Sequence, residues 1–335
     1  MIDSTIPKTA PAPPNWIKSL TAGFDTVGNH IGLIFFSIVF DVLLWCAPHL
    51  SIQKLLVSTF NQVMVIPEMK SPEMAQMLNL SQEFWLNFAK RYNLFGTIRT
   101  LPVGIPSLMA VRTPIETPVG QPVFWEISSW WIAFGLFMLL AVVGIILGSF
   151  FFKLVAQAAV EGKVSWHQAF AQWAWTSIQV FLLTLFALLL FLTFVFPFSC
   201  LISALLLGGF GLQRYSFLIL ILFLSLIIWW LFPLVFSPHG IFVYRLEMWN
   251  SVRKGIRLTR MTLPTTGLLF LSIVIINKGL DYLWKLPPEA SWLALVGIAG
   301  HAFVTTSLLA ATFIYYRDAD LWVQGVVRKA VLNSM

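Results

Sequence analysis

Three ionisable side chains interrupt otherwise apolar segments, and they are the residues best placed to do chemistry. Asp41 lies in the apolar run of residues 31–50, and Lys278 and Asp281 lie in that of residues 264–284. A mid-membrane Asp costs about 2.5–3.5 kcal/mol on insertion scales, so it should face protein or water and have a partner. We expect an ion pair with Lys278 that fixes helix packing. Proton or ion coupling, a neutral hydrogen-bonded Asp41 and an i, i+3 pair of Lys278 with Asp281 are the alternatives.

His301 is the most informative histidine. It lies in the apolar run of residues 292–316, where Gly297, Gly300 and Ala302 are expected to leave open space beside its imidazole. Such space suits a haem or chlorophyll-type macrocycle, and it suits tight helix packing equally. We interpret His301 as a packed core histidine, with a tetrapyrrole ligand as the alternative. No other cofactor and no metal is predicted.

The sequence contains no catalytic constellation. A Gly-rich phosphate loop, a Cys pair at metal spacing and an HExxH pattern are all missing from it. Cys46 and Cys200 both fall in apolar segments, where cysteine behaves as a small hydrophobe. The longest segment between apolar runs, residues 51–126, has no room for a soluble catalytic domain. We therefore predict that the chain is not an enzyme.

Composition predicts an integral membrane protein. Of 335 residues, 58% are hydrophobic and 10% charged, and the mean hydropathy is +0.83; soluble domains average about 45–50% apolar and about 25% charged. Spanning about 30 Å of hydrocarbon takes roughly 20 residues. The expected fold is all-α, with six transmembrane helices arranged as three hairpins. Their predicted ranges are residues 31–50, 130–152, 178–207, 216–244, 264–284 and 292–316.

The distribution of Lys and Arg predicts the orientation. Of the 21 basic residues, twelve lie in segments on the side of the N-terminus and three in or near the short loops of the other side. Six more fall in the long loop of residues 51–126, and long loops weigh little in this rule. We predict a bacterial inner-membrane protein with both termini cytoplasmic. The net charge of +7 then reflects cytoplasmic loops and contact with the bilayer, not nucleic-acid binding.

Amphipathic segments precede the first, third and fifth spans. Residues 16–30, 165–177 and 248–263 carry apolar residues at helical spacing, and each runs directly into an apolar segment. We expect three interfacial elbow helices, each leading into a transmembrane hairpin on the cytoplasmic side.

The third elbow is the most basic. Arg253, Lys254, Arg257 and Arg260 lie close together in it and are predicted to contact anionic lipid. Contact with a protein partner is a second interpretation of the same residues.

Residues 51–126 break the hairpin plan. One amphipathic helix is expected within them, followed by an irregular, proline-rich stretch over residues 101–121 whose apolar content favours docking on another surface. Gly144 and Gly148, in the span that follows, permit close helix contact. The chain thus divides into residues 1–50, 51–126, 127–316 and a cytoplasmic tail, 317–335. The predicted partner surface is the apolar stripe of the amphipathic helix: Met74, Leu78, Trp85, Phe88 and Tyr92.

Two short motifs resemble a known family. The stretch Val160-Glu-Gly-Lys-Val-Ser-Trp-His-Gln-Ala-Phe matches a Glu-Gly-x-x-Ser-x-x-x-Ala pattern, and Ile314-Tyr-Tyr-Arg-Asp follows the last span. Both are similar to bacterial multi-pass proteins related to the membrane domain that is fused to glycerophosphodiester phosphodiesterases. The segment from Asp41 to Leu50 also looks like the first span of such bacterial proteins. The resemblance excludes residues 51–126 and implies a six-helix bundle without catalysis of its own.

These observations favour a non-enzymatic accessory or scaffold subunit that packs against other membrane subunits. One alternative is a carrier for a lipid or small hydrophobic molecule, with Asp41, Asn277, Lys278 and Asp281 lining a cavity. A second is a pigment-binding subunit that uses His301.

Overall fold

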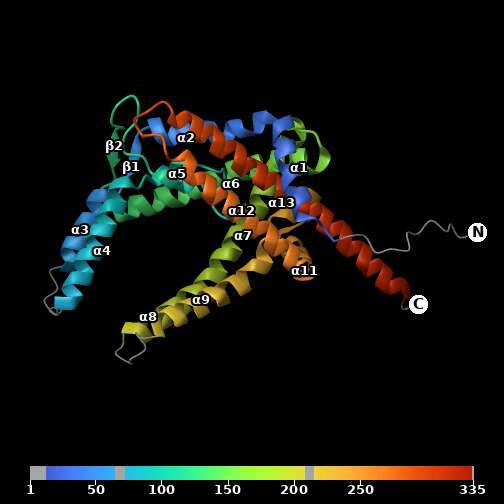
Figure 1. The fold of residues 1–335 in the computed structure, drawn as a ribbon. Coiled ribbons are helices and arrows are strands. Elements are labelled where there is room, and N and C mark those ends of the chain that lie inside the picture. The colour runs from blue at the N-terminus through green and yellow to red at the C-terminus, as the bar shows by residue number, and fades with distance from the viewer. Residues whose placement is uncertain (1–12, 65–71, 208–214, 334–335) are drawn as a thin grey trace, which may run out of the picture. The chain divides into compact units, whose positions relative to one another are not determined.

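The apolar runs of the sequence form helices in a computed structural model that describes residues 13–64, 72–207 and 215–333 (Figure 1). Residues 1–12, 65–71, 208–214 and 334–335 lie outside the described part of the chain. The main helices are α1 (Trp16–Asn29), α2 (Phe35–Cys46), α3 (Gln53–Met64), α4 (Pro72–Arg91), α5 (Met109–Arg112), α6 (Trp130–Glu161), α7 (Trp166–Leu190), α8 (Phe196–Leu207), α9 (Ser216–Leu231), α10 (His239–Tyr244), α11 (Met248–Met261), α12 (Leu263–Trp284) and α13 (Ala294–Asn333). Short helical segments are η1 (Ile31–Ile34), η2 (Leu94–Ile98), η3 (Phe191–Val195) and η5 (Phe232–Leu234).

Within the described residues, five helices are long and apolar enough to cross a membrane. They are Trp130–Glu161, Trp166–Ser203, Phe217–Tyr244, Leu263–Trp284 and Ala294–Leu332; the bent pair of Trp16–Asn29 and Ile31–Cys46 is a sixth if the two helices count as one span. This confirms the coarse prediction of an all-α chain with several membrane-length helices; six were predicted, and five or six are present among the described residues. The last helix continues through most of the predicted tail, because no proline interrupts it after Tyr316.

Two of the three expected elbow helices are separated from the helix that follows, and one is not. The helical stretches before and after His30 are bent by 91°, and Thr262 separates α11 from α12 with a non-helical backbone. The expected separate helix over residues 165–177 is wrong, because α7 begins at Trp166 and continues to Leu190. No glycine or proline interrupts α7, so nothing in its sequence breaks the helix after residue 177.

Chain contacts divide the protein into two compact units. Unit 1 comprises Met1–Thr26, Phe152–Ile273 and Ser307–Met335, and unit 2 comprises Val27–Phe151 and Val274–Thr306. In unit 1, aromatic side chains fill the core around Phe236, whose ring stacks on Tyr315 at 5.8 Å between centroids.

In unit 2, a two-stranded parallel ribbon joins the two ends of the long loop. Strand β1 (His49–Ser51) pairs with β2 (Phe124–Glu126), with His49 opposite Phe124. Below the ribbon, Leu94 packs with apolar residues at the start of α6. The long loop is therefore folded back against its own unit, and α3 and α4 form a helical hairpin that emerges from it (Figure 1).

The segment between η2 and α5 runs along α6. A Cβ on Gly144 would meet the carbonyl oxygen of Ile98, and one on Gly148 would lie 2.7 Å from the Cα of Gly104. Gly148 is eighteen residues into α6, so the contact lies about 27 Å along its axis. The two glycines thus allow an irregular chain segment to approach α6 closely, whereas the sequence indicated that another helix would pack there. Within residues 101–121, Val103, Ile105 and Leu108 are buried in the protein itself, whereas Leu101 is 83% exposed.

We expect Gly148→Ala to destabilise unit 2, because the added methyl group would displace the backbone at Gly104. Overpacking of this kind costs about 1–3 kcal/mol. The measurement is the thermal unfolding midpoint in detergent. Gly135→Ala on the same helix is the matched control, since a Cβ there meets nothing within 4 Å. Equal midpoints for the two variants would contradict the close approach.

A second prediction concerns pH. His49 is buried, with Nε2 3.0 Å from the carbonyl oxygen of Leu44. Burial lowers the pKa of His49, and the bond to Leu44 raises it in part. The unfolded chain therefore binds the proton first as pH falls below about 6.5. The contribution of neutral His49 to the free energy of unfolding should be fully present above that pH. It should be lost as the pH falls towards the lower pKa that His49 has in the folded state.

The measurement is the unfolding midpoint against pH for the native chain and for His49→Gln. Removing the imidazole should flatten the decline between pH 6.5 and the folded-state pKa of His49. An unchanged decline would assign the pH dependence to another group.

Candidate functional site

Asp41 binds the backbone of the loop segment between η2 and α5, close to the start of α5. Its side chain is fully buried, and Oδ1 accepts hydrogen bonds from the Ser107 hydroxyl and from the Met109 amide at 2.9 Å. Oδ2 accepts from the Leu108 amide at 3.0 Å. Ser107 Oγ in turn accepts from the Ala110 amide at 2.9 Å. The carboxylate thereby satisfies amides at the start of α5 that have no partner within that short helix.

The structure does not place Asp41 beside Lys278, as the sequence led us to expect. Both Asp41 oxygens are occupied by the loop, whose amides fold into place next to them. Lys278 Nζ instead lies 3.9 Å from Asp281 Oδ2, the i, i+3 alternative, and its side chain is 66% exposed. An exposed pair at this distance contributes little to stability.

Asp281 and His301 form a buried pair between α12 and α13. His301 Nδ1 lies 3.0 Å from Asp281 Oδ1. The expected open space beside His301 is filled, because a Cβ on Gly300 would lie 2.6 Å from the Trp284 ring and Gly297 abuts the Trp284 carbonyl. His301 Nε2 is buried without a hydrogen-bond partner among the described residues. The pair can hold a proton between carboxylate and imidazole.

Arg99 brings a positive charge to this region. It interacts electrostatically with Asp281 and Asp41. Burial lowers the pKa of the Arg99 guanidinium, and the two carboxylates raise it in part. Sequence reasoning missed Arg99, because its position in a proline-rich loop carries no signal of proximity to either carboxylate.

Glu289 joins the loop between α12 and α13 to the long loop. Its carboxylate lies 3.2 Å from Arg91 and 3.7 Å from Arg112, and it accepts from the Ile115 amide at 3.0 Å. Its backbone carbonyl accepts from Trp45 Nε1 at 3.1 Å. Glu289 was also missed, since a single loop carboxylate has no distinguishing pattern in the sequence.

The predicted aromatic stripe on α4 is present where side chains are described. The rings of Trp85 and Phe88 are 5.8 Å apart and those of Phe88 and Tyr92 are 5.1 Å apart. Phe84, which the sequence analysis omitted, is 64% exposed and contacts Trp85. The side chains of Met74 and Leu78 lie outside the described part of the structure.

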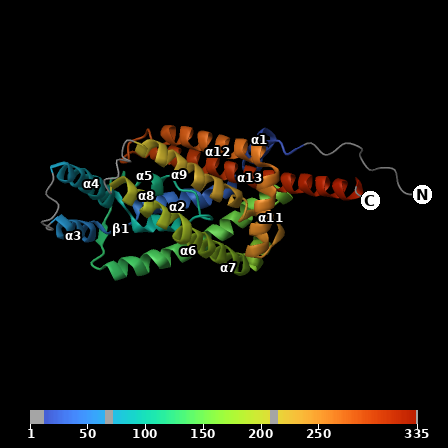
Figure 2. The ribbon, with the colours of Figure 1, turned by 90° about the horizontal axis from the view of Figure 1, so that it is seen from below.

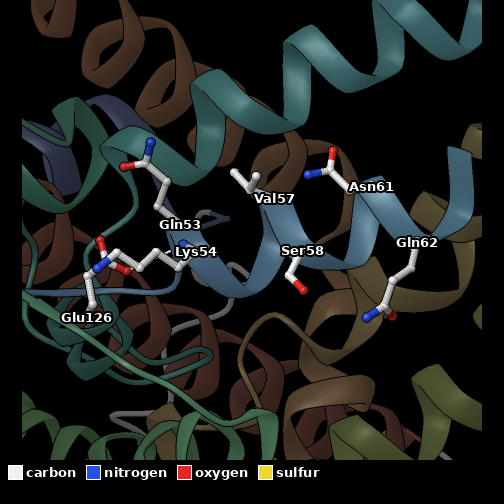
Figure 3. A pocket seen from close by; sticks show the side chains of 7 residues that line it. All are labelled: Gln53, Lys54, Val57, Ser58, Asn61, Gln62 and Glu126. Atoms are coloured by element: carbon white, nitrogen blue, oxygen red, sulfur yellow. Dashed lines mark hydrogen bonds between the residues drawn. The ribbon is translucent and has the colours of Figure 1, made fainter.

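A polar pocket of about 660 Å³ lies along α3, apart from the residues around Asp41 and Asp281 (Figure 3). The Lys54 amide donates to Glu126 Oε2 at 3.4 Å at one end of it. The side-chain amides and the hydroxyl group that line the pocket suit hydrogen bonding to a polar molecule. The lining consists of Gln53, Lys54, Val57, Ser58, Asn61, Gln62 and Glu126.

The basic residues of α11 separate into two groups. Arg253, Arg257 and Arg260 are exposed. Lys254, the fourth residue predicted to contact anionic lipid, donates to Asp320 Oδ2 at 2.8 Å and is therefore already paired with a carboxylate. Asp320 lies on α13 in the segment that the sequence indicated to be a tail.

Comparison with family models, with curated proteins and with solved structures found no match to this chain. Across the parts of the chain that the structure describes, no group of three or more His, Cys, Asp or Glu side chains could hold a metal ion. Function is therefore inferred from the surfaces and contacts described above.

We expect Asp41→Asn to loosen residues 93–115, because an amide nitrogen would replace one oxygen and face an N–H or O–H donor. An unsatisfied buried donor costs about 1–3 kcal/mol. Hydrogen exchange should rise in peptides that contain Leu108 and Met109. Lys278→Gln is the control and should leave exchange there unchanged. Unchanged exchange at Leu108 and Met109 in Asp41→Asn would contradict the contact between Asp41 and the loop.

Proposed function

We propose that this chain is a non-enzymatic, multi-pass membrane protein that serves as an accessory or scaffold subunit of a larger membrane complex. The observation that carries the proposal is the aromatic surface of α4, formed by Phe84, Trp85 and Phe88. These side chains are 64%, 41% and 41% exposed, and their rings are in contact with one another. Contiguous exposed apolar patches mark interaction sites, and aromatic residues dominate binding at protein interfaces.

A membrane-crossing helix does not account for this surface. Helix α4 is not among the described helices that are long and apolar enough to cross a membrane. Its last turn carries Lys90 and Arg91. An aromatic patch on a helix of this polarity suits contact with an apolar face of another protein.

The hairpin that carries the patch is anchored along α3 and at the end of α4. Trp130 Nε1, at the start of α6, donates to the Thr59 hydroxyl of α3 at 3.2 Å. Arg91, at the end of α4, pairs with Glu289, and Asn93 Oδ1 accepts from the Leu50 amide at 3.1 Å. A preformed surface loses less conformational entropy on binding.

The proposed topology places six spans in a bacterial inner membrane, with both termini cytoplasmic. The bend after α1 and the separate helix α11 support elbow helices before the first and fifth spans. The excess of basic residues on that side supports the orientation.

A carrier for a lipid or small hydrophobic molecule is the second candidate. It is favoured by Arg99 and Lys278, two cations that lie near the buried Asp281–His301 pair. Charged groups in membrane-length helices mark substrate or ion pathways by default.

Phe84→Ser with Phe88→Ser should remove partner proteins that co-purify with the tagged chain after mild detergent extraction. Loss of two exposed aromatic anchors of this kind weakens binding by roughly 2–4 kcal/mol in total. Quantitative mass spectrometry of the extract from native membranes is the measurement.

Val119→Ser is the matched control, because Val119 is 77% exposed on a loop of the same unit and lies away from α4 in sequence. Partners should be retained by the control and lost from the double variant. A stoichiometric lipid with no partner protein, unchanged in the double variant, would contradict the scaffold proposal and favour the carrier.

A further inference from the structure

The exposed arginines of α11 form one stripe. Arg253, Arg257 and Arg260 lie at i, i+4 and i+7, a spacing that aligns side chains on one helical face. The stripe is about 10 Å long at 1.5 Å per residue. On the buried face, Gly255 packs against the backbone of Phe236, where a Cβ would lie 2.9 Å from its carbonyl carbon. This close packing fixes which face of α11 remains open.

The neighbouring acidic groups of unit 1 do not neutralise the stripe. Asp320 is bound by Lys254 and by Gln324, each at 2.8 Å. Asp318 pairs with Arg317 at 2.9 Å. Glu247, which precedes α11, forms no ion pair with the three arginines among the described residues. No ion pair between described side chains reaches Arg253, Arg257 or Arg260, so three positive charges are available together.

The chain places this stripe beside a membrane span. Only Thr262 separates α11 from α12, and α12 is one of the helices able to cross a membrane. Figure 2 shows α11 running crosswise to α13. The guanidinium of Arg253 lies 5.2 Å from the centroid of the Trp249 ring. Tryptophan is enriched at the level of lipid headgroups.

We propose that Arg253, Arg257 and Arg260 bind the phosphate groups of anionic phospholipids. Guanidinium groups match phosphate oxygens in bidentate geometry. The adjoining span favours a lipid headgroup over an acidic protein, because it holds the arginines where phosphates are concentrated. The inference is independent of the partner surface on α4, which belongs to the other unit.

The test uses the full chain in mild detergent and phosphatidylglycerol as the anionic probe, with phosphatidylcholine as the neutral one. Bound lipid is counted by native mass spectrometry over a lipid titration. Arg253→Gln, Arg257→Gln and Arg260→Gln combined should weaken phosphatidylglycerol binding by roughly 100-fold, at about a factor of five for each arginine. Phosphatidylcholine binding should not change, and higher salt should weaken the phosphatidylglycerol binding.

A matched variant combines Lys18→Gln, Lys163→Gln and Arg328→Gln, which removes three exposed charges from the same unit. It should retain phosphatidylglycerol binding. An equal loss in both variants would show that net charge alone attracts the lipid and would overturn the proposal. So would a native chain that shows no preference for phosphatidylglycerol but loses a co-purified protein when the three arginines are replaced.

Discussion

The architecture of unit 2 depends on one buried carboxylate. Asp41 accepts from the Ser107 hydroxyl and from the amides of Leu108 and Met109. In a medium of low dielectric constant, unsatisfied backbone amides are costly, and so is an unpaired carboxylate. Each group satisfies the other, so a segment with amides that are not paired in a helix can lie against an apolar helix.

The enclosed segment connects the other features of the unit. Its first part lies against Gly144 and Gly148 of α6. Its end reaches Glu289, which also pairs with the end of α4. The hairpin that presents Phe84, Trp85 and Phe88 therefore stands on a base held by hydrogen bonds and ion pairs. A fixed base of this kind suits a docking surface, which supports the scaffold role over a role in which the loop must open.

Local patterns in the sequence predicted the features that depend on local physics. Apolar runs became helices, the aromatic spacing on α4 placed Trp85 and Phe88 together, and the arginine spacing on α11 placed three side chains on one exposed face. Tertiary partners were not predictable in the same way. Asp41 faces a proline-rich loop and not Lys278, because the fold brings two amides to it from residues 67 and 68 positions away.

The same limit applies to the open space expected beside His301 and to the interaction partner of Lys254. Gly297 and Gly300 indicated an absence of side chains on their own helix, but Trp284 comes from the preceding one. Lys254 lies next to Arg253 in sequence, yet Asp320 on α13 draws it to another surface. In both cases the deciding residue lies on a different helix.

The central claim is that the loop segment, and not Lys278, is the partner of Asp41. Cysteine cross-linking tests it directly, in a chain with Cys46→Ala and Cys200→Ala. Asp41→Cys with Ser107→Cys should form an intramolecular disulfide on mild oxidation, seen as a linked peptide pair by mass spectrometry. Asp41→Cys with Lys278→Cys should form none. A disulfide in the second chain and not in the first would contradict the account.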